Sequence, residues 1–260
     1  MKIISWNVNS IRARKEQLVK ILMDENPDFV CLQETKILNE IFPIDEIKKL
    51  GYRSYVNGMA AYNGVAILSK YEAEEVNTHD FCKKKDSRHI NIKFKNLNIH
   101  SIYVPAGGDL ADISLNEKFK HKLEFLREMK SYFNFEETKI NILCGDLNVA
   151  PYEDDVWSHK QLRNVVSHTQ MERESLINIL ETGNFIDGIR KFISPPKNIF
   201  TWWSYRSKDF RVNNRGRRLD HIWVTDSRKI NLKDAHIFVN KRELNKPSDH
   251  VPISLKFDYS

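Results

Sequence analysis

The sequence is poor in cysteine, and the few cysteines that it has are widely spaced. Cys31, Cys82 and Cys144 are an odd number and form no CxxC pair. Two of them lie inside apolar runs, where a free cysteine usually behaves as a small buried hydrophobe. The pattern excludes a disulfide framework and a cysteine-rich zinc site, and we expect a protein of a reducing, intracellular and cytoplasmic compartment.

Long apolar runs and linker sequences are missing as well. No apolar stretch approaches the roughly 18 residues that a membrane span needs, and no signal peptide opens the chain, so we expect a soluble protein without a membrane partner. No linker rich in Pro, Gly or Ser, no low-complexity segment and no internal repeat divides the sequence. Since acids in the same strand-edge context occur near both ends, residues 1–260 are interpreted as a single domain.

The excess of positive charge is small and unevenly distributed. The chain has 41 Lys+Arg against 35 Asp+Glu, which gives a formal net charge of +6. Much of the excess lies in one basic stretch, which contains Arg206, Lys208, Arg211, Arg215, Arg217 and Arg218. Such clustering indicates an anionic partner. A smaller run, Lys83-Lys84-Lys85, is more typical of a solvated surface.

Short apolar segments alternate with amphipathic ones. Strands are expected at Ile3–Trp6, Phe29–Leu32, Val65–Leu68, Ile90–Phe94, Leu97–Val104, Ile140–Cys144, His221–Thr225, Ala235–Val239 and Ile253–Phe257. Helices are expected over Ile11–Met23 and after two capping boxes, Ser114-x-x-Glu117 and Thr169-x-x-Glu172. Helices between strands, together with strands joined directly, indicate a mixed sheet in an α/β domain.

Polar side chains stand at the edges of several of these strands. Some follow their strand and others precede it: Asn7, Glu34, Asp146 with Asn148, Asp220, and Asp249 with His250. A carboxylate buried beside a core costs several kcal/mol unless it is paired or holds a cation. The repetition of that cost predicts that the strand ends converge on one site for a hard cation such as Mg²⁺ or Mn²⁺, which prefers carboxylate and amide oxygens.

Each of these motifs also has an ordinary structural explanation. A single glutamate after a strand, such as Glu34, commonly caps a helix or lies on the surface. The tetrapeptide Gly145-Asp146-Leu147-Asn148 is typical of an Asx-turn, although residues two apart in an extended chain can address one ligand. An aspartate that accepts a hydrogen bond from histidine Nδ1 would fix the ring tautomer and raise its basicity, but Asp beside His also occurs by chance.

Eight segments together resemble one known family. They are, in order, Ser5–Arg14, Cys31–Lys36, Tyr62–Ser69, Tyr103–Pro105, Cys144–Pro151, Phe200–Arg206, Asn214–His221 and Ser248–Pro252. This set resembles the exonuclease III family of AP (apurinic/apyrimidinic) endonucleases, within the metal-dependent endonuclease/exonuclease/phosphatase superfamily, over nearly the whole chain. The resemblance implies a DNase I-like, four-layered α/β sandwich, with two mixed β-sheets packed face to face and helices outside.

The resemblance also implies roles for the strand-edge residues. Glu34 would be the main ligand of Mg²⁺, for which Mn²⁺ can substitute, and further direct or water-mediated support would come from Asn7, Asn9, Asp146, Asn148 and Asp249. Asp146 would orient or deprotonate the attacking water, and Asn148 would hold it in place.

The scissile phosphate has its own implied contacts. His250, braced by Asp220, would contact this phosphate, and Tyr103 would face the phosphate or the leaving oxygen. These residue types suit phosphodiester hydrolysis, which requires charge stabilisation, an aligned water and help for the leaving oxyanion.

The implied substrate is double-stranded DNA with abasic or blocked 3′ ends. Trp202 and Leu219 would wall a pocket for a deoxyribose that lacks its base. Further DNA contacts would come from Arg12, Arg14, Lys36, Tyr62, Arg206 and Arg217. The neighbouring aromatics Trp203 and Tyr205 are more typical of core packing. We expect a monomer without an obligate protein partner.

Three positions depart from the family pattern. Ala106 follows Pro105 where many members carry Asn, and Asn9 replaces an Asp found in some members. Arg217 stands where an apolar residue usually completes the abasic pocket, so a clamp on phosphate or a looser selectivity is expected there.

The implied function is a DNA repair nuclease of base excision repair that cuts 5′ to abasic sites, with 3′→5′ exonuclease and 3′-phosphatase or phosphodiesterase activity. A hydrolase of phospholipid or inositol phosphate head groups is disfavoured by the segment from Trp202 to Asp220. A nucleic-acid-binding protein without catalysis would be expected to have lost one of the main site residues, and all are present: Glu34, Asp146, Asp220, Asp249 and His250.

Overall fold

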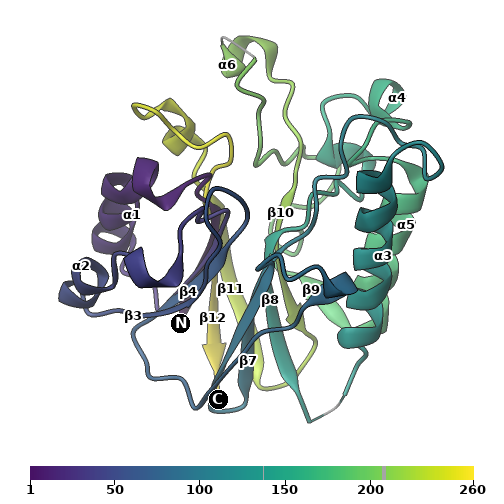
Figure 1. Cartoon of the computed structure of the whole chain (residues 1–260). Helices are drawn as coiled ribbons and strands as arrows, with labels where there is room; N and C mark the ends of the chain where they lie inside the picture. Colours follow the sequence, from purple (N-terminus) through teal and green to yellow (C-terminus); the bar gives the residue numbers. More distant parts are fainter. Residues whose placement is uncertain (137, 207–208) are drawn as a thin grey trace.

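A computed structural model describes residues 1–136, 138–206 and 209–260; Lys208 of the basic stretch lies outside these ranges. The chain forms two six-stranded sheets that pack face to face, with helices on both outer faces (Figure 1). The expected four-layered sandwich is therefore confirmed. Among the described residues, no helix combines the length and the apolar character that crossing a membrane requires.

The first sheet has the order β11-β12-β1-β2-β4-β3. Its strands are β11 (Ile230–Ile237), β12 (Ile253–Tyr259), β1 (Lys2–Asn7), β2 (Phe29–Gln33), β4 (Val65–Ser69) and β3 (Arg53–Asn57). β1 and β2 are parallel, and the other neighbours are antiparallel. The helices α1 (Ile11–Glu25) and α2 (Ile44–Lys49) cover its outer face (Figure 1).

The second sheet has the order β5-β6-β7-β8-β10-β9. Its strands are β5 (Glu75–Asn77), β6 (His89–Phe94), β7 (Leu97–Tyr103), β8 (Ile140–Asp146), β10 (Asp220–Thr225) and β9 (Phe185–Asp187). Here β7 and β8 are the parallel pair. The helices α3 (Glu117–Tyr132) and α5 (Gln170–Thr182) cover the outer face, and the short helices α4 (His159–Leu162) and α6 (Phe210–Asn213) lie in the connections (Figure 1).

Alternation along the strands builds separate apolar layers. Ile3 of β1 packs in the layer between the two sheets, whereas its neighbours Ile4 and Trp6 belong to the layer beneath α1. In β8, Ile142 faces the inner layer and Leu143 packs beneath α3 and α5. Since successive strand residues point to opposite faces, short apolar runs with no polar gap predict strands that are covered on both sides.

The helix boundaries follow their capping residues, with one correction. α1 ends at Glu25 and is capped by Asn26, which adopts a left-handed conformation with φ 45° directly before Pro27. The expected capping box of Thr169 and Glu172 opens α5. The box expected at Ser114 was wrong, because α3 is capped by the Asn116 side chain, which accepts from the Lys118 N–H.

Every expected apolar segment overlaps a strand, although Val104 lies beyond the end of β7, and Phe238 and Val239 lie beyond the end of β11; three strands were not expected. β3, β5 and β9 are short or carry side chains that stay partly exposed, so they lack a clear apolar run. β11 runs from Ile230 to Ile237 and so begins earlier than the expected Ala235–Val239. Its first half was missed because exposed polar residues alternate there with apolar ones and no apolar run marks the strand. Three 3₁₀ turns precede α5 at Asn39–Ile41, Phe81–Lys83 and Glu153–Asp155, and a fourth spans Val239–Glu243.

Candidate active site

The strand-edge residues meet at one end of the two packed sheets. The parallel strands β1 and β2 end together at Asn7 and just before Glu34. In the other sheet, the last residue of β8, Asp146, lies directly opposite the first residue of β10, Asp220. One ligand atom each from Glu34, Asp146 and His250 lies within 4.8 Å of the others. Residues that are far apart in the sequence therefore form one compact acidic cluster.

Asn7 holds two acids of this cluster together. Its Nδ2 donates to Glu34 Oε1 and to Asp146 Oδ2, each at 2.8 Å. Its Oδ1 accepts from the backbone N–H of Asn9 at 3.0 Å. The amino group of Asn7 faces the two carboxylates, and its oxygen is engaged with the backbone of Asn9. In this arrangement Asn7 braces the carboxylates and has no free oxygen to offer to a cation.

Glu34 is held as a carboxylate by a neighbouring cation. Lys36 Nζ lies 2.7 Å from Glu34 Oε2 and 2.6 Å from Asn9 Oδ1. Burial alone would raise the pKa of Glu34, but the Lys36 ammonium and the Asn7 amide outweigh it and lower this pKa below its ordinary value. Glu34 has φ 51, a left-handed conformation that is uncommon for glutamate and is found more often at functional sites.

Asp146 and Asn148 form an Asx-type turn that also faces the cluster. The Asn148 N–H donates to Asp146 Oδ1 at 3.0 Å, and Asn148 Nδ2 donates to Val104 O at 2.9 Å and to Asp146 Oδ2 at 3.3 Å. The Asx-turn expected of this tetrapeptide is therefore present, and it brings the two side chains into contact. Burial raises the pKa of Asp146 to about 7, although the nearby His250 ring opposes the shift.

His250 is oriented by Asp220. Its Nδ1 lies 2.8 Å from Asp220 Oδ2, and its Nε2 lies 3.5 Å from Asp146 Oδ2. Burial lowers the pKa of an imidazole, but Asp220 and Asp146 together raise the pKa of His250 well above its ordinary value. Of the two aspartates near this ring in the sequence pattern, Asp220 is the one that contacts Nδ1.

Tyr103 ends β7 beside the same cluster. Burial, followed by the charges of Glu34 and Asp146, raises the pKa of its phenol well above the usual value, so the hydroxyl keeps its proton. The guanidinium of Arg88 lies 4.7 Å from the centre of the Tyr103 ring, and Arg88 Nη1 donates to Tyr103 O at 3.2 Å. No sequence pattern pointed to Arg88, since it is an isolated arginine between the exposed Lys83-Lys84-Lys85 run and β6.

Asp249 lies just outside the compact cluster. Its Oδ1 accepts from Asn9 Nδ2 at 2.9 Å, and its Oδ2 accepts from Trp202 Nε1 at 3.0 Å. Burial raises the pKa of Asp249, but His250 and these two donors outweigh it and lower this pKa. In this arrangement Asp249 links the acids to Trp202, through which the cluster is continuous with the basic stretch.

The residues at this edge fit a divalent cation. The carboxylates of Glu34 and Asp146 offer ligand oxygens within one small region, and the Lys36 ammonium already bridges oxygens of Glu34 and Asn9. That placement of an ammonium shows that the local field favours positive charge. Carboxylate and amide oxygens are the ligands of hard cations, so the donor set suits the cation expected from the sequence.

The residues expected to contact DNA divide into exposed and engaged side chains. Arg12, Tyr62 and Arg206 are exposed. Arg14 is engaged, because its guanidinium donates to Asn9 O at 2.6 Å and to Tyr205 Oη and Pro247 O at 2.8 Å each. Arg12, Tyr62 and Arg206 are therefore accessible to a ligand, whereas Arg14 connects the loops of Asn9, Tyr205 and Pro247.

The basic stretch is not one uniform surface. Arg218 was counted in the basic stretch that indicates an anionic partner, but it cannot meet such a partner, because it is fully buried and forms ion pairs with Asp187 and Asp155. Arg217 covers Trp202, with 5.5 Å between guanidinium and ring centre, and donates to Val166 O at 2.9 Å and Ser167 Oγ at 2.6 Å.

The residues expected to wall the abasic pocket and the two neighbouring aromatics differ in their burial. Leu219 is buried and Trp202 is partly exposed. Trp203 is buried, as expected for a core residue, whereas Tyr205 is 49% exposed and contradicts that expectation. Tyr205 is held at the surface because its hydroxyl donates to Pro247 O and accepts from Arg14.

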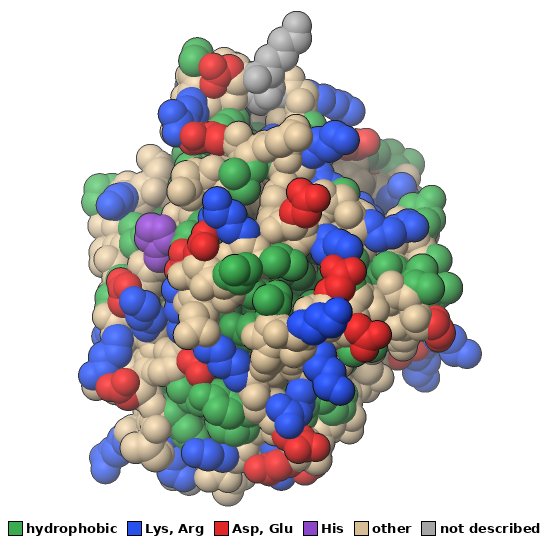
Figure 2. Space-filling view, turned by 90° about the vertical axis from the view of Figure 1, so that its left-hand side faces the viewer, with side chains coloured by type: hydrophobic (Ala, Val, Ile, Leu, Met, Phe, Trp, Pro, Cys, Tyr) green, Lys and Arg blue, Asp and Glu red, His purple; other side chains and the backbone are tan. Residues whose placement is uncertain are grey.

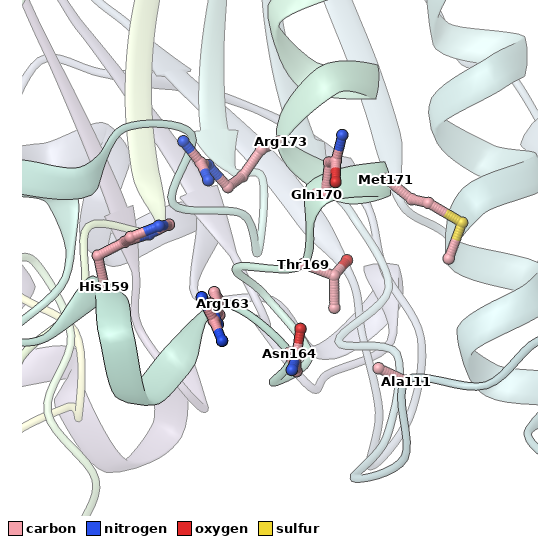
Figure 3. Close-up of a pocket in the computed structure, with 8 residues that line it drawn as sticks. All are labelled: Ala111, His159, Arg163, Asn164, Thr169, Gln170, Met171 and Arg173. Carbon is pink, nitrogen blue, oxygen red and sulfur yellow. The ribbon is translucent and has the colours of Figure 1, made fainter.

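Two other surface regions contain none of the clustered acids. A hollow beside α4 and the start of α5 is lined by residues that include His159, Arg163 and Arg173 (Figure 3). On the face that carries α1 and α2, Lys and Arg side chains are interspersed with Asp and Glu (Figure 2). The positive excess is therefore not gathered on that face.

The geometry of the site agrees with the family that matches the sequence. Residues 4–250 match the endonuclease/exonuclease/phosphatase family. The chain belongs to this family. It is 32% identical to exodeoxyribonuclease III of Haemophilus influenzae, over 99% of this chain and 100% of the relative. It is 34% identical to an exodeoxyribonuclease of Bacillus subtilis, over 98% of both chains.

Solved structures of this family show the same fold. An AP endonuclease from Archaeoglobus fulgidus superposes with a TM-score of 0.91 at 34% identity, covering 99% of both chains. The 3′ phosphatase NExo from Neisseria, bound to a product DNA hairpin, superposes with a TM-score of 0.90 at 29% identity over 100% of both chains.

Proposed function

We propose that this chain is a metal-dependent DNA repair nuclease that hydrolyses the phosphodiester 5′ to abasic sites, with 3′→5′ exonuclease and 3′-phosphatase or phosphodiesterase activity. The observation that carries the proposal is the convergence of Glu34, Asp146 and the Asp220–His250 pair. The curated relatives named exodeoxyribonuclease and the solved AP endonuclease and 3′ phosphatase support the same activities.

Asp146 is the group that activates water in this proposal. Its carboxylate accepts a proton from the attacking water, and the Asn148 amide, which already contacts Asp146, holds the two in line. A carboxyl whose pKa is raised by burial is a stronger base than an exposed aspartate. The cluster also keeps Glu34 ionised, so the two acids can serve different roles.

His250 and Tyr103 face the phosphate. Asp220 keeps the imidazole protonated, so Nε2 can donate to a non-bridging phosphate oxygen as negative charge develops there. The protonated Tyr103 hydroxyl can donate to the phosphate or the leaving 3′ oxygen. These roles require donors whose protons are held at neutral pH, which is the direction of both pKa shifts.

Mg²⁺, or Mn²⁺ in its place, is the proposed cofactor. Glu34 would be its main ligand, Asp146 would share it, and Asn148 and Asp249 would support it directly or through water. Asn7, which was also expected among the ligands, would brace the two carboxylates instead, because its Nδ2 donates to both. When bound, such a cation stabilises the charge on the phosphate oxygens. The Lys36 side chain would then exchange its ion pair with Glu34 for a contact with a backbone phosphate, because it is only partly buried and can reach the surface.

The proposed substrate is duplex DNA. Arg12, Lys36, Tyr62 and Arg206 would contact the backbone, and Trp202 with Leu219 would wall the pocket for an abasic sugar. Arg14 and Arg217 would act mainly by fixing the surfaces around them, given the bonds that they already make. We further propose that residues 1–260 act as a single domain and as a cytoplasmic monomer.

One labelled duplex tests the proposal. It carries a tetrahydrofuran abasic analogue and is incubated with the protein in two separate reactions, one with Mg²⁺ and one with EDTA. Two further duplexes are treated in the same way: one without the analogue, and one that ends in a 3′-phosphate. Incision 5′ to the analogue in Mg²⁺ alone is the expected result. Binding without incision in Mg²⁺ would reject the nuclease in favour of a non-catalytic binding protein.

A further inference from the structure

Lys122 and Glu172 form an ion pair that has no exposed surface. Lys122 Nζ lies 2.5 Å from Glu172 Oε1, and both side chains are 0% exposed. Desolvation of two charges is costly, and replacing a buried pair by neutral residues of similar volume is often neutral or stabilising. The pair connects α3 to the start of α5, close behind the loop that carries Asn148.

The Lys122 ammonium holds the loops that follow two site strands. Besides Glu172, it donates to Asn148 O at 2.7 Å and to Ala106 O at 3.3 Å. An ammonium has three N–H donors, so each has an acceptor here. Ala106 lies just beyond Tyr103, and Asn148 just beyond Asp146, so one buried cation anchors both loops.

Asn148 is therefore held by hydrogen bonds to two different residues, Asp146 and Lys122. Its side-chain amide and backbone N–H contact Asp146, while its carbonyl accepts from Lys122. Asn148 has φ 52, so the chain turns sharply at the residue that must stay aligned with Asp146. The loop also packs tightly on the lysine, because a Cβ at Gly107 would lie 2.9 Å from Lys122 Cδ.

Glu172 extends the same network to the substrate side. Its Oε1 accepts from the Ser167 N–H at 2.9 Å, and its Oε2 accepts from Thr169 Oγ1 at 2.7 Å. Ser167 has φ 80, its Oγ accepts from Arg217, and its carbonyl accepts from the Ala150 N–H at 2.8 Å. The buried pair therefore lies between the Asp146–Asn148 turn and the arginine that covers Trp202.

We propose that Lys122 and Glu172 are positioning residues of the nuclease proposed above, on which this inference rests. They hold the Asn148 carbonyl and the Ser167 turn, and so keep the Asn148 amide aligned with Asp146 and the attacking water. Neither residue contacts substrate in this proposal. In this proposal the pair serves the alignment of the loop, because the replacement of a buried ion pair by neutral residues of similar volume is often neutral or stabilising.

The experiment compares Lys122→Met with the double variant Lys122→Met/Glu172→Gln. The single variant leaves a buried carboxylate without its partner, so we expect a clear loss of stability. The double variant removes both charges and keeps the volumes and the acceptor for Ser167, so its thermal midpoint should return close to that of the wild type. Lys2→Met/Glu25→Gln, an ion pair at the start of β1 and the end of α1, is the matched control.

Two readouts separate alignment from stability. On the abasic-analogue duplex, the double variant should lose about 10–100-fold in kcat with KM changed by less than about threefold. Hydrogen exchange in residues 147–150 should accelerate, while exchange in β1 and β2 should not. The control pair should change neither kcat nor exchange in that loop.

Three results would overturn the proposal: wild-type kcat in the stable double variant, a kcat loss that only follows the unfolded fraction, or unchanged exchange in residues 147–150. If the wild-type protein cuts none of the duplexes, the proposed function fails. Hydrogen exchange then still decides whether the pair fixes the loop.

Discussion

Asp220 and His250 come from opposite sheets and meet at a distance of 2.8 Å between Oδ2 and Nδ1. Asp220 begins β10 in one sheet, and His250 lies three residues before β12 in the other. The orientation of the imidazole is therefore set by the packing of the two sheets. Neither sheet alone could hold the ring against its acid.

Replacing Asp220 by Asn should lower turnover strongly. The amide cannot stabilise the charged imidazole as a carboxylate does, so the pKa of His250 should fall and its tautomer should no longer be fixed. By analogy with other histidines that lose their acid, we expect a loss of about 10²–10⁴-fold in single-turnover cleavage. Asp226→Asn, an exposed aspartate just after β10, is the control. Equal rates for the two variants would rule out the bracing role.

Replacing Glu34 by Gln should weaken the dependence on Mg²⁺. The amide loses the charge that attracts the cation, so the Mg²⁺ concentration for half-maximal cleavage should rise by about tenfold or more. Glu40→Gln changes an exposed glutamate in the 3₁₀ turn Asn39–Ile41 and should leave the titration unchanged. An identical Mg²⁺ titration in Glu34→Gln would reject Glu34 as the principal ligand.

DNA affinity should fall steeply with salt, and Arg206 should contribute to that slope. Each phosphate contact contributes about 0.9 to the slope of log affinity against log salt, so Arg206→Gln should flatten it by about one. Asp220 begins β10 and Thr225 ends it, and the exposed Arg228 follows that far end of the strand. Arg228→Gln therefore serves as the control. A flat salt response in the wild type would remove the proposed phosphate contacts.

Much of the fold was predictable because its strands are covered on both faces. Phe29–Leu32 forms an apolar run without polar gaps and is fully buried, and Ile140–Cys144 is interrupted only by Asn141, the one residue of β8 that stays partly exposed. The missed strands β3 and β5 carry exposed side chains, so no periodic signal marks them. Ser114 resembled a helix cap because its spacing to Glu117 fits, but the side chain of Asn116 caps the helix two residues later.

The residues that hold the site in place were harder to predict than the acids in it. Glu34 and Asp146 stand out because acids at buried strand ends are unusual. No sequence pattern marks Lys122 or Arg218 as buried, since each has charged residues nearby in the sequence, and only the packing shows that both are fully buried. A sequence pattern gives the chemistry of a side chain but not which distant carboxylate or carbonyl will meet it.

The buried histidines of the second sheet predict a dependence of stability on pH. His89 and His100 lie 3.0 Å apart, and His100 Nε2 lies 3.2 Å from Asn141 Oδ1. Burial lowers the pKa of His100 to about 4. Between this value and the ordinary value near 6.5 the unfolded chain binds the extra proton, so the free energy of unfolding falls as the pH is lowered through that window.

The variant His100→Gln measures this contribution. Denaturant unfolding at several pH values should give a shallower decline between about pH 6.5 and 4 than in the wild type, with a difference of up to about 3 kcal/mol. If both proteins lose stability in parallel across the window, His100 makes no contribution to the acid sensitivity of the fold.

Cleavage by Asp146→Asn, with DNA binding followed in parallel, decides whether Asp146 activates the attacking water. The substitution keeps the shape of the side chain and removes its ability to accept a proton. We predict a loss of several orders of magnitude in single-turnover incision of the abasic-analogue duplex in Mg²⁺, with affinity for the same duplex nearly unchanged. Near-normal cleavage by Asp146→Asn would contradict the account.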